Sequence, residues 1–395
     1  MENELLLSPG ARLVHVGAHK TGTTAVQGAF SLAAGRLAEH GVSYFGPVPG
    51  RTYLKGALAV TGSKPQLGQP VPDLRHWTDL VADLAAQGDR RVLVSSAFFG
   101  DGDAAAAARV VADLSPSPVY PVVTLRPLAK VLPSQWQQYV QNGLRLSYED
   151  WLDGTFNRPP GQGPRPTFWR RHRHDELVAR WAEAAGPDQV IAIVVDESDR
   201  LMLLRTFEEL LGLPAGFLEL DDSAENRSLT LGEAELIRLV NEEIDRREWP
   251  EKIYSMFMKG GALKQLKVGY RPGPGEPRVS TPAWALKRAA EIDTEMAGRI
   301  ADLGVRVVGS ISSLAAPDAS PAADAPETAP TVPAAAAAQA IIGAIAGSQV
   351  PGQLTAKKQP PRVEDRPVRD VDARSLARVL AGRAKRRAAG TLRRR

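Results

Sequence analysis

The chain has 395 residues, of which 43% are hydrophobic, so it is long enough for one large α/β domain or two smaller ones with a sizeable core. It contains no cysteine, which excludes disulfides and thiolate metal sites and gives no indication of an oxidising compartment. Residues 356–395 carry 14 Lys/Arg and 4 Asp/Glu, whereas the first 355 residues carry a net −6, so the basic tail is no reason to expect nucleic-acid binding by the folded part.

The N-terminal segment, residues 1–10, has acidic residues and only a short apolar run. A secretory signal would have a basic start and a longer apolar segment. We therefore expect the protein to be cytoplasmic.

Short, nearly continuous runs of apolar and β-branched residues predict strands buried on both faces, at 12–16, 91–95, 119–125 and 190–195. Apolar residues at spacings of three and four predict helices at 24–40, 76–86, 135–142, 176–185 and 201–211. Strands that alternate with helices indicate a three-layer α/β/α fold with a central parallel sheet, in which ligands gather at the carboxyl ends of the strands. Clusters of Pro and Gly predict loops at 158–166 and 271–277.

Residues 13–24, LVHVGAHKTGTT, combine a predicted strand, a loop bounded by Gly17 and Gly22, and the start of a helix. Such a loop directs backbone N–H groups at a phosphate. A triphosphate-binding loop of the type GxxxxGKS/T has its lysine directly after the second glycine. Here Thr23 occupies that position, and the lysine is three residues earlier, at Lys20.

Hydroxyl groups remain beside this displaced lysine, at Thr21, Thr23 and Thr24. Together with Gly22 and the loop N–H groups, they suit a single 5′-phosphate, with Lys20 directed at the group that leaves it. In its KTGTT string the chain resembles the sulfotransferases that use 3′-phosphoadenosine 5′-phosphosulfate (PAPS), whose 5′-phosphosulfate loop often has this sequence. The resemblance implies a fold like that of the P-loop nucleoside triphosphate hydrolases, PAPS as the donor without a metal, and Lys20 at the bridging oxygen.

A second anion site is predicted after the strand at 119–125. Arg126 follows this strand directly, and Ser134 comes eight residues later, beside Pro133. Because Pro is favoured in the first turn of a helix, we expect a helix to begin there, with Ser134 at its positive end. The planar fork of an arginine together with a hydroxyl suits a phosphate.

The resemblance extends to this segment, RPLAKVLPS, because PAPS sulfotransferases bind the 3′-phosphate with an arginine after a strand and a serine about eight residues on. It continues more weakly over residues 12–314. Two separate anion sites favour a nucleotide that is phosphorylated at both its 5′ and 3′ positions. ATP has no 3′-phosphate for the second site.

In-line sulfuryl transfer needs a cation at the leaving oxygen and a base for the proton of the acceptor. Lys20 is the predicted cation. Many bacterial relatives have a glutamate after a serine pair on the strand that corresponds to 91–96, but this chain has Ala97 there. His19 is the predicted base or substrate contact, although the charge of Lys20 would lower its pKa.

Several other acidic and histidine side chains are weaker candidates for the base. Asp101 and Asp103 could replace the missing glutamate, although a Gly/Asp turn is usually a solvated loop. His76 is a lesser candidate. His172 and His174 lie in the basic run RRHRH, which is expected to be a solvated face or, if it is functional, to suit an anionic acceptor.

Polar residues in the second half of the chain could contact the cofactor. Lys259 and Lys264 precede the second Pro/Gly loop and could close over it. The segment ENRSL brings Asn226 and Ser228, which could reach the adenosine or the acceptor. By default this segment is expected only to pack.

The folded domain, residues 1–314, is expected to end where the composition shifts to Ala, Pro, Asp, Ser and Thr. Residues 315–360 are a predicted linker with a short apolar segment at 334–347, well below the roughly 20 residues that span a bilayer. Residues 361–395 form a basic tail, expected to be disordered or partly helical and solvated. Contact of this tail with an anionic membrane surface, a polysaccharide or a protein is the alternative.

The predicted function is transfer of a sulfuryl group from PAPS to a hydroxyl or amine of a carbohydrate or small-molecule acceptor. A non-catalytic nucleotide- or glycan-binding protein of the same fold is an alternative, which Ala97 keeps open. A nucleotide kinase is a further alternative, disfavoured because no lysine follows Gly22. The identity of the acceptor and the oligomeric state do not follow from the sequence.

Overall fold

The structure is a computed structural model that describes residues 4–47, 53–65, 69–159, 161–221, 227–315 and 330–348. Within these residues, six strands form one sheet in the order β2-β3-β1-β4-β5-β6, and every neighbouring pair is parallel. The strands are β1 (Arg12–Gly17), β2 (Val42–Phe45), β3 (Arg91–Ser95), β4 (Val119–Leu125), β5 (Ile191–Val194) and β6 (Arg306–Val308). All residues of β1, β2 and β5 are buried, as expected for strands that are covered on both faces.

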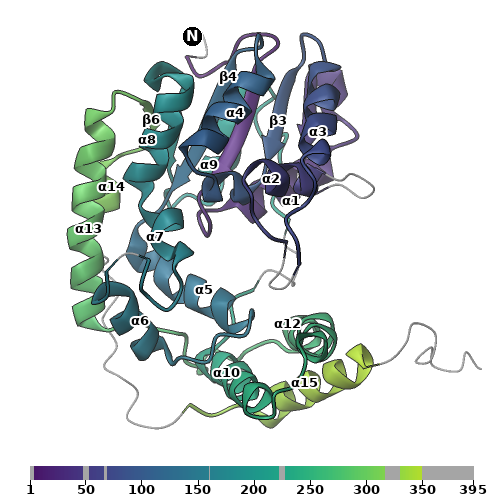
Figure 1. The fold of residues 1–395 in the computed structure, drawn as a ribbon, viewed down its shortest axis with the longest axis vertical. Coiled ribbons are helices and arrows are strands. Elements are labelled where there is room, and N and C mark those ends of the chain that lie inside the picture. The colour runs from purple at the N-terminus through teal and green to yellow at the C-terminus, as the bar shows by residue number, and fades with distance from the viewer. Residues whose placement is uncertain are drawn as a thin grey trace, which may run out of the picture.

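Helices cover both faces of this sheet (Figure 1). Val14 and Val16 face one layer, whose helices are α2 (Tyr53–Val60), α3 (Arg75–Ala85), α4 (Ala104–Leu114), α8 (His174–Ala185) and the C-terminal part of α13 (Ala283–Asp302). Leu13 faces the other layer, which consists of α1 (Thr23–Ala33) and α9 (Met202–Leu211). The predicted three-layer α/β/α fold with a central parallel sheet is confirmed.

The elements observed match most of those predicted. The four predicted strands are β1, β3, β4 and β5, whereas β2 and β6 are edge strands of four and three residues, too short to give a clear pattern. The helix predicted at 24–40 is two elements, because α1 ends at Ala33 and the 3₁₀ turn η1 (Leu37–His40) follows after Gly35. The described residues of the two predicted Pro/Gly loops form neither helix nor strand.

A second helical layer lies opposite the carboxyl ends of the strands (Figure 1). It contains α5 (Leu128–Val140), α6 (Tyr148–Phe156), α7 (Thr167–His172), α10 (Leu231–Arg246), the π-helix η5 (Tyr254–Ala262) and α12 (Leu263–Gly269). Trp136 and Trp151 are fully buried in its core. The described residues also form short helical turns, namely η2 (Ala97–Asp101), η3 (Pro187–Gln189), α11 (Glu251–Ile253) and α14 (Ser312–Ala315). Because β4 leads directly into α5, this layer is held opposite the strand ends.

The apolar segment at 334–347 forms the helix α15 (Ala334–Gly347), which packs against η5 and α12. A Cβ atom on Gly261 would collide with the carbonyl oxygen of Gly343, so glycine lets the two helices touch backbone to backbone. Residues 316–329 and 349–395 lie outside the described residues, so the domain boundary, the linker and the basic tail stay predictions. None of the helices described here is long and apolar enough to cross a membrane.

The N-terminus of α5 is capped from a distant part of the chain. The side chain of Pro127, at the N-cap position, has no hydrogen-bond acceptor. Both carboxyl oxygens of Asp293, on α13, instead accept the N–H of Leu128, at 3.1 and 2.9 Å. Burial raises the pKa of Asp293 to about 8, and the hydrogen bond from Leu128 only partly opposes this. The folded state therefore keeps a proton on Asp293 that the unfolded chain loses near pH 4.

We expect the free energy of unfolding to fall as the pH rises from 4 to 8, by up to about 1.4 kcal/mol per pH unit from this group. The raised folded-state pKa sets the sign, because the folded state binds more protons in this window. Asp293→Asn keeps an acceptor for Leu128 but cannot ionise, so it should remove that slope. Urea unfolding of both proteins at pH 5, 6.5 and 8 measures the difference. Parallel slopes in the two proteins would contradict the assignment.

Candidate functional site

The loop between β1 and α1 lies between the carboxyl ends of β3 and β4, the strands that flank β1. Gly17 and Gly22 have backbone φ angles of +95° and +99°, which residues other than glycine rarely adopt. A Cβ atom on Gly17 would lie 3.2 Å from the Cα of Ala97, so the loop passes close to η2. Lys20, at φ +67°, is one of two described non-glycine residues with positive φ. Such backbone strain is concentrated at functional sites.

The side chain of Thr21 faces the protein interior. It is fully buried, its hydroxyl donates to the carbonyl of Ala18 at 2.7 Å, and it also bonds the hydroxyl of Thr124 on β4. This corrects the expectation that the hydroxyl of Thr21 faces a phosphate, because these bonds use it to hold the loop on the sheet. Thr23 and Thr24 line the cavity beside the loop, and the hydroxyl of Thr23 also donates to the carbonyl of Ala18, at 3.3 Å.

The ammonium group of Lys20 is held at the same cavity. Its Nζ donates to Oε1 of Gln138 on α5 at 3.1 Å. Burial, together with the charges of Lys267 and Arg126, lowers the pKa of Lys20 to about 8. A cation that burial and like charges destabilise gains from a bound anion. The position therefore favours an anionic ligand.

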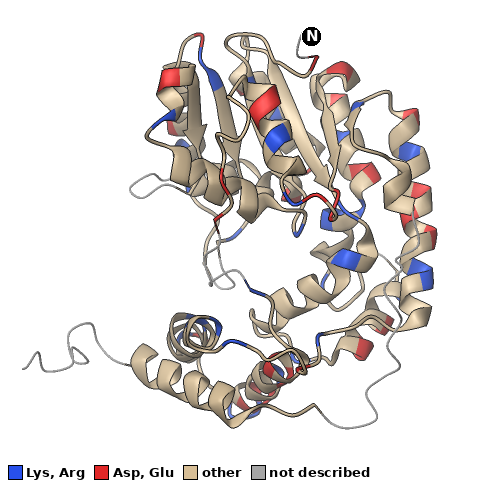
Figure 2. Ribbon diagram, turned by 180° about the vertical axis from the view of Figure 1, so that it is seen from behind, with Lys and Arg blue, Asp and Glu red and all other residues tan. Residues whose placement is uncertain are grey.

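The cavity has a volume of about 1150 Å³ and lies between the strand ends and the second helical layer. It brings together most of the predicted site, namely His19, Lys20, Gly22, Thr23, Thr24, Arg126 and Ser134. Among the described side chains that line it, seven are Lys or Arg and two are Asp or Glu. Figure 2 shows that basic residues occur in both the sheet layer and the second helical layer. Such a charge imbalance attracts anions.

Arg126 connects the two predicted anion sites. It follows β4, and its Nη1 donates to the carbonyl oxygen of Lys20 at 3.2 Å. Its Nε donates to Glu197 at 2.5 Å, and about a quarter of its side chain is exposed. The described contacts of Arg126 leave Nη2 for a ligand in the cavity.

Ser134 lines the cavity but does not begin a helix. The helix α5 starts at Leu128, so Pro133 and Ser134 lie in its middle. The hydroxyl of Ser134 donates to the carbonyl of Val131 at 3.0 Å. The prediction that Ser134 sits at the positive end of a helix is therefore wrong, because α5 begins directly after β4 and carries Pro133 as an interior residue. A hydroxyl can still accept a hydrogen bond or turn toward a ligand.

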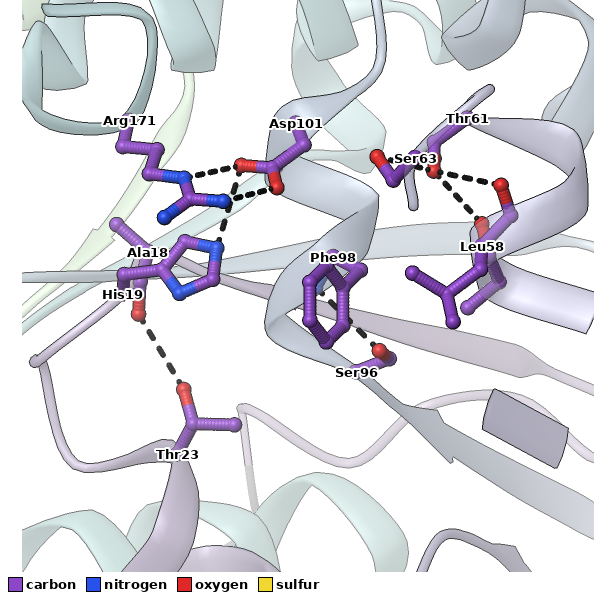
Figure 3. Close-up of polar contacts among 12 residues, drawn as sticks. Ala18, His19, Thr23, Leu58, Thr61, Ser63, Ser96, Phe98, Asp101 and Arg171 are labelled. Atoms are coloured by element: carbon purple, nitrogen blue, oxygen red, sulfur yellow. Dashed lines mark hydrogen bonds and ion pairs between the residues drawn. The ribbon is translucent and has the colours of Figure 1, made fainter. Parts of the chain in front are cut away.

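His19 is part of a partly buried ionic cluster (Figure 3). Its Nε2 lies 3.2 Å from Oδ1 of Asp101, and Arg171 binds both oxygens of Asp101, at 2.7 and 2.6 Å. Burial alone would raise the pKa of Asp101, but the hydrogen bonds and charges of His19 and Arg171 hold it well below its ordinary value. Asp101 is therefore an ionised carboxylate that orients His19, and not the free base considered from the sequence.

The protonation of His19 follows from this arrangement. Burial lowers the pKa of His19, and the charge of Arg171 adds to that effect, while Asp101 opposes it. The imidazole is therefore neutral at pH 7. Because a carboxylate only accepts hydrogen bonds, Nε2 carries the hydrogen, and Nδ1 keeps a lone pair. The ring of Phe98 packs edge-on against the imidazole, with centroids 5.7 Å apart.

The other base candidates take structural roles or lie elsewhere. Asp103 caps α4, because its carboxylate accepts the N–H of Ala106. His76 lies on α3 and is not among the residues that line the cavity. Ala97 does line the cavity, at the start of η2, and its side chain is a methyl group that cannot act as a base.

The prediction of a solvated face for His172 and His174 is wrong. Both side chains are fully buried at the junction of α7 and α8. Burial holds the pKa of His172 well below its ordinary value and lowers that of His174 to about 4, so both rings are neutral. Neither lines the cavity, because each lies on the buried face of its helix, His172 with Phe168 on α7 and His174 with Val178 on α8.

The remaining cofactor candidates are only partly brought together. Lys259, on η5, and Ser228 line the large cavity. Lys264 borders a smaller adjacent cavity of about 260 Å³, together with Lys267. Asn226 lies outside the described residues.

Three residues of the site escaped the sequence reasoning. Gln138 holds Lys20, Arg171 binds Asp101, and Arg165 lines the cavity with no carboxylate partner among the described residues. Arg165 lies within the predicted Pro/Gly loop at 158–166, and Arg171 lies in the basic run RRHRH, and these two features were the available signals. Gln138 sits four residues after Ser134 on one helix face, a spacing that would have placed both at the cavity.

No protein-family model matches the chain, and a search of curated proteins found no match. Among solved structures, a sulfotransferase from Alicyclobacillus acidocaldarius is similar, with 18% sequence identity and a TM-score of 0.38. The alignment covers 62% of this chain and 95% of that one. A likeness at this level carries no argument about activity, so a functional conclusion depends on the residues of the cavity.

Proposed function

We propose that the chain is a sulfotransferase that uses PAPS as its donor. One observation supports this above the others: a single cationic cavity is lined by Lys20, Thr23 and Thr24 from the first loop and by Arg126 and Ser134 from the second segment. PAPS has anionic groups at both its 5′ and 3′ positions. The cavity has two sets of hydrogen-bond donors, one for each of these groups.

The residues present fit such a donor. Lys20 and the helix N-terminus after Gly22 would hold the 5′-phosphosulfate, and Arg126 and Ser134 would hold the 3′-phosphate. The bound donor would supply an activated sulfuryl group, whose transfer leaves adenosine 3′,5′-bisphosphate. Gln138 positions the ammonium of Lys20 for the charge that develops on the leaving oxygen. The strained backbone of Lys20 is consistent with this role.

His19 is our candidate for the proton acceptor. Asp101 holds its Nε2–H, so the lone pair of Nδ1 is available to take a proton from a hydroxyl or amine of the acceptor. His19 lines the same cavity as Lys20. His19, oriented by Asp101, would supply the base that Ala97 cannot supply.

Thermal unfolding in the presence of nucleotides tests the donor. We expect adenosine 3′,5′-bisphosphate at 100 times its Kd to stabilise the protein by about 2.7 kcal/mol, which raises the midpoint by several degrees. ATP with magnesium should stabilise it far less, because it has no 3′-phosphate for Arg126. Equal stabilisation by both nucleotides, or none by either, would refute the proposal.

A variant of the second site sharpens this test. Arg126→Ala should weaken bisphosphate binding about 10- to 100-fold, since it removes a charge-assisted hydrogen-bond donor to the 3′-phosphate. Adenosine 5′-monophosphate lacks that phosphate and should lose little affinity. The alternative functions are separated by transfer of labelled sulfate from PAPS to a panel of sugars and phenols, which a non-catalytic binding protein would not support.

A further inference from the structure

The cavity is larger than one nucleotide requires. Pockets for single drug-sized ligands are about 300–1000 Å³, and this one measures about 1150 Å³. Part of its lining comes from residues that the donor sites do not use: Tyr139 on α5, Arg165 and Thr167 around the start of α7, and Arg171 on α7. This part of the lining is available to a second ligand.

Most arginines around this cavity are neutralised by a carboxylate. Arg171 pairs with Asp101, and Arg145 pairs with Asp245. Arg165 differs from them. Among the described residues no carboxylate lies within 4 Å of it, and its guanidinium stacks over the ring of Tyr139, 5.3 Å from the centroid. The Nε of Arg165 is buried and donates to no described partner.

A buried guanidinium N–H without an acceptor is unfavourable, because it has lost water and gained no hydrogen bond. Burial also lowers the pKa of Arg165, and the charge of Arg171 lowers it further, whereas Tyr139 raises it. An anion in the cavity would neutralise the charge of this guanidinium. The planar fork of an arginine matches the two oxygens of a carboxylate.

Arg165 is connected to the proposed base through neighbouring side chains. Tyr139 lies beneath Arg165, and the charges of both Arg165 and Arg171 act on its phenol. Arg171 binds Asp101, which in turn binds His19. An acceptor held at Arg165 would therefore extend past Tyr139 and Arg171 toward His19. Phe98 and Trp249 also line the cavity and offer apolar faces to a sugar ring or an aromatic ring.

We propose that Arg165 recognises a carboxylate of the sulfuryl acceptor, so that the acceptor is a hydroxylated carboxylic acid such as a uronic-acid sugar. The inference rests on the proposed function, because it assigns the second ligand of the same cavity. The donor phosphates already have their own cations in Lys20 and Arg126. Arg165 thereby selects acidic acceptors over neutral ones of the same shape.

Digalacturonate and its methyl ester form a matched pair of probes, because esterification removes the carboxylates and leaves the sugar hydroxyls. Binding of both is measured by calorimetry on the full chain, saturated with adenosine 3′,5′-bisphosphate so that the donor sites are filled. We expect the acid to bind at least about tenfold tighter than the ester. Arg165→Gln should abolish this preference, and Arg165→Lys, which keeps a charge without the fork, should retain part of it.

Arg170→Gln is the matched control, since Arg170 is exposed, neighbours the same segment and does not line the cavity. It should leave the preference unchanged, and thermal midpoints confirm that each variant is folded. Equal binding of acid and ester to the unmodified protein would overturn the inference. Loss of bisphosphate affinity in Arg165→Gln would also overturn it, because Arg165 would then belong to the donor site.

Failure of the proposed function gives a different result. If the unmodified protein does not bind the bisphosphate at all, the donor assignment is wrong. The comparison of acid and ester, repeated without the nucleotide, still decides whether Arg165 holds a carboxylate.

Discussion

Replacing His19 with alanine is expected to lower kcat by about 10²- to 10⁴-fold, the usual contribution of a positioned general base. The Nδ1 lone pair of His19 is the candidate acceptor of the proton, and the methyl group of Ala97 cannot replace it. Binding of adenosine 3′,5′-bisphosphate should change little, because the phosphates are assigned to other residues. Steady-state transfer of labelled sulfate, with calorimetric titration of the bisphosphate, measures both effects.

The pH dependence of kcat/KM gives a second readout of His19. Only the neutral imidazole can accept a proton, so the rate should rise with pH through a pKa below the ordinary 6.5, because burial disfavours the charged ring. Asp101→Asn removes the carboxylate that raises the pKa of His19. The rise of kcat/KM with pH should therefore occur at still lower pH, while kcat falls. If Asp101 had only a structural role, the pH at which kcat/KM rises would not change.

Controls are needed because Asp101 is also paired with Arg171. Removing one partner of a buried ion pair costs about 3–5 kcal/mol of stability, so each variant is assayed well below its unfolding midpoint. The assignment of His19 as the base would be wrong if His19→Ala kept kcat within a few fold of the unmodified protein.

Replacing Lys20 with alanine is expected to lower kcat by about 10²- to 10³-fold, equivalent to roughly 3–4 kcal/mol of transition-state stabilisation. The ammonium group, held by Gln138, is positioned for charge that develops only as the sulfuryl group leaves. Bisphosphate affinity should fall much less than kcat. Arg126→Ala should show the opposite order, with affinity lost first.

The lowered pKa of Lys20 also predicts a loss of activity at alkaline pH. Because its pKa is lowered to about 8, kcat/KM should fall above that pH as the ammonium loses its proton. Lys20→Arg stays charged and should extend activity to higher pH, if the longer side chain reaches the same oxygen. Lys20→Asn controls for backbone strain, since asparagine tolerates positive φ better than alanine. Loss of bisphosphate affinity with intact kcat in both neutral variants would reverse the roles assigned to Lys20 and Arg126.

Much of the fold follows from local sequence. The apolar runs of β1, β3, β4 and β5 are recognisable because strands buried on both faces need apolar residues at every position. The loop with Gly17, Lys20 and Gly22 is equally local, because positive φ angles and a helix start are encoded by the glycines and threonines themselves. That Arg126 borders the same cavity follows from a parallel sheet, in which adjacent strands end at one edge.

Errors arose where a local rule met a tertiary contact. The position of Pro133 predicts a helix start there, but α5 begins at Leu128, whose N–H is accepted by Asp293, 165 residues away in the sequence. Thr21 was assigned to a phosphate, whereas the neighbouring strand provides Thr124 as its partner. In each case the competing interaction comes from a residue that is distant in sequence, and nothing in the local sequence indicates that contact.

The sequence by itself determined the parallel sheet, the phosphate-type loop and the two cationic positions Lys20 and Arg126, because strand burial, glycine conformation and strand-end chemistry are properties of short segments. Only the tertiary structure decided which side chains surround them. It joined His19 to Asp101 and Arg171, which are 82 residues and more away from it along the chain, and it left the Nε of Arg165 buried without an acceptor among the described residues. Protonation and charge pairing depend on burial and on distant neighbours, and these exist only after the chain has packed.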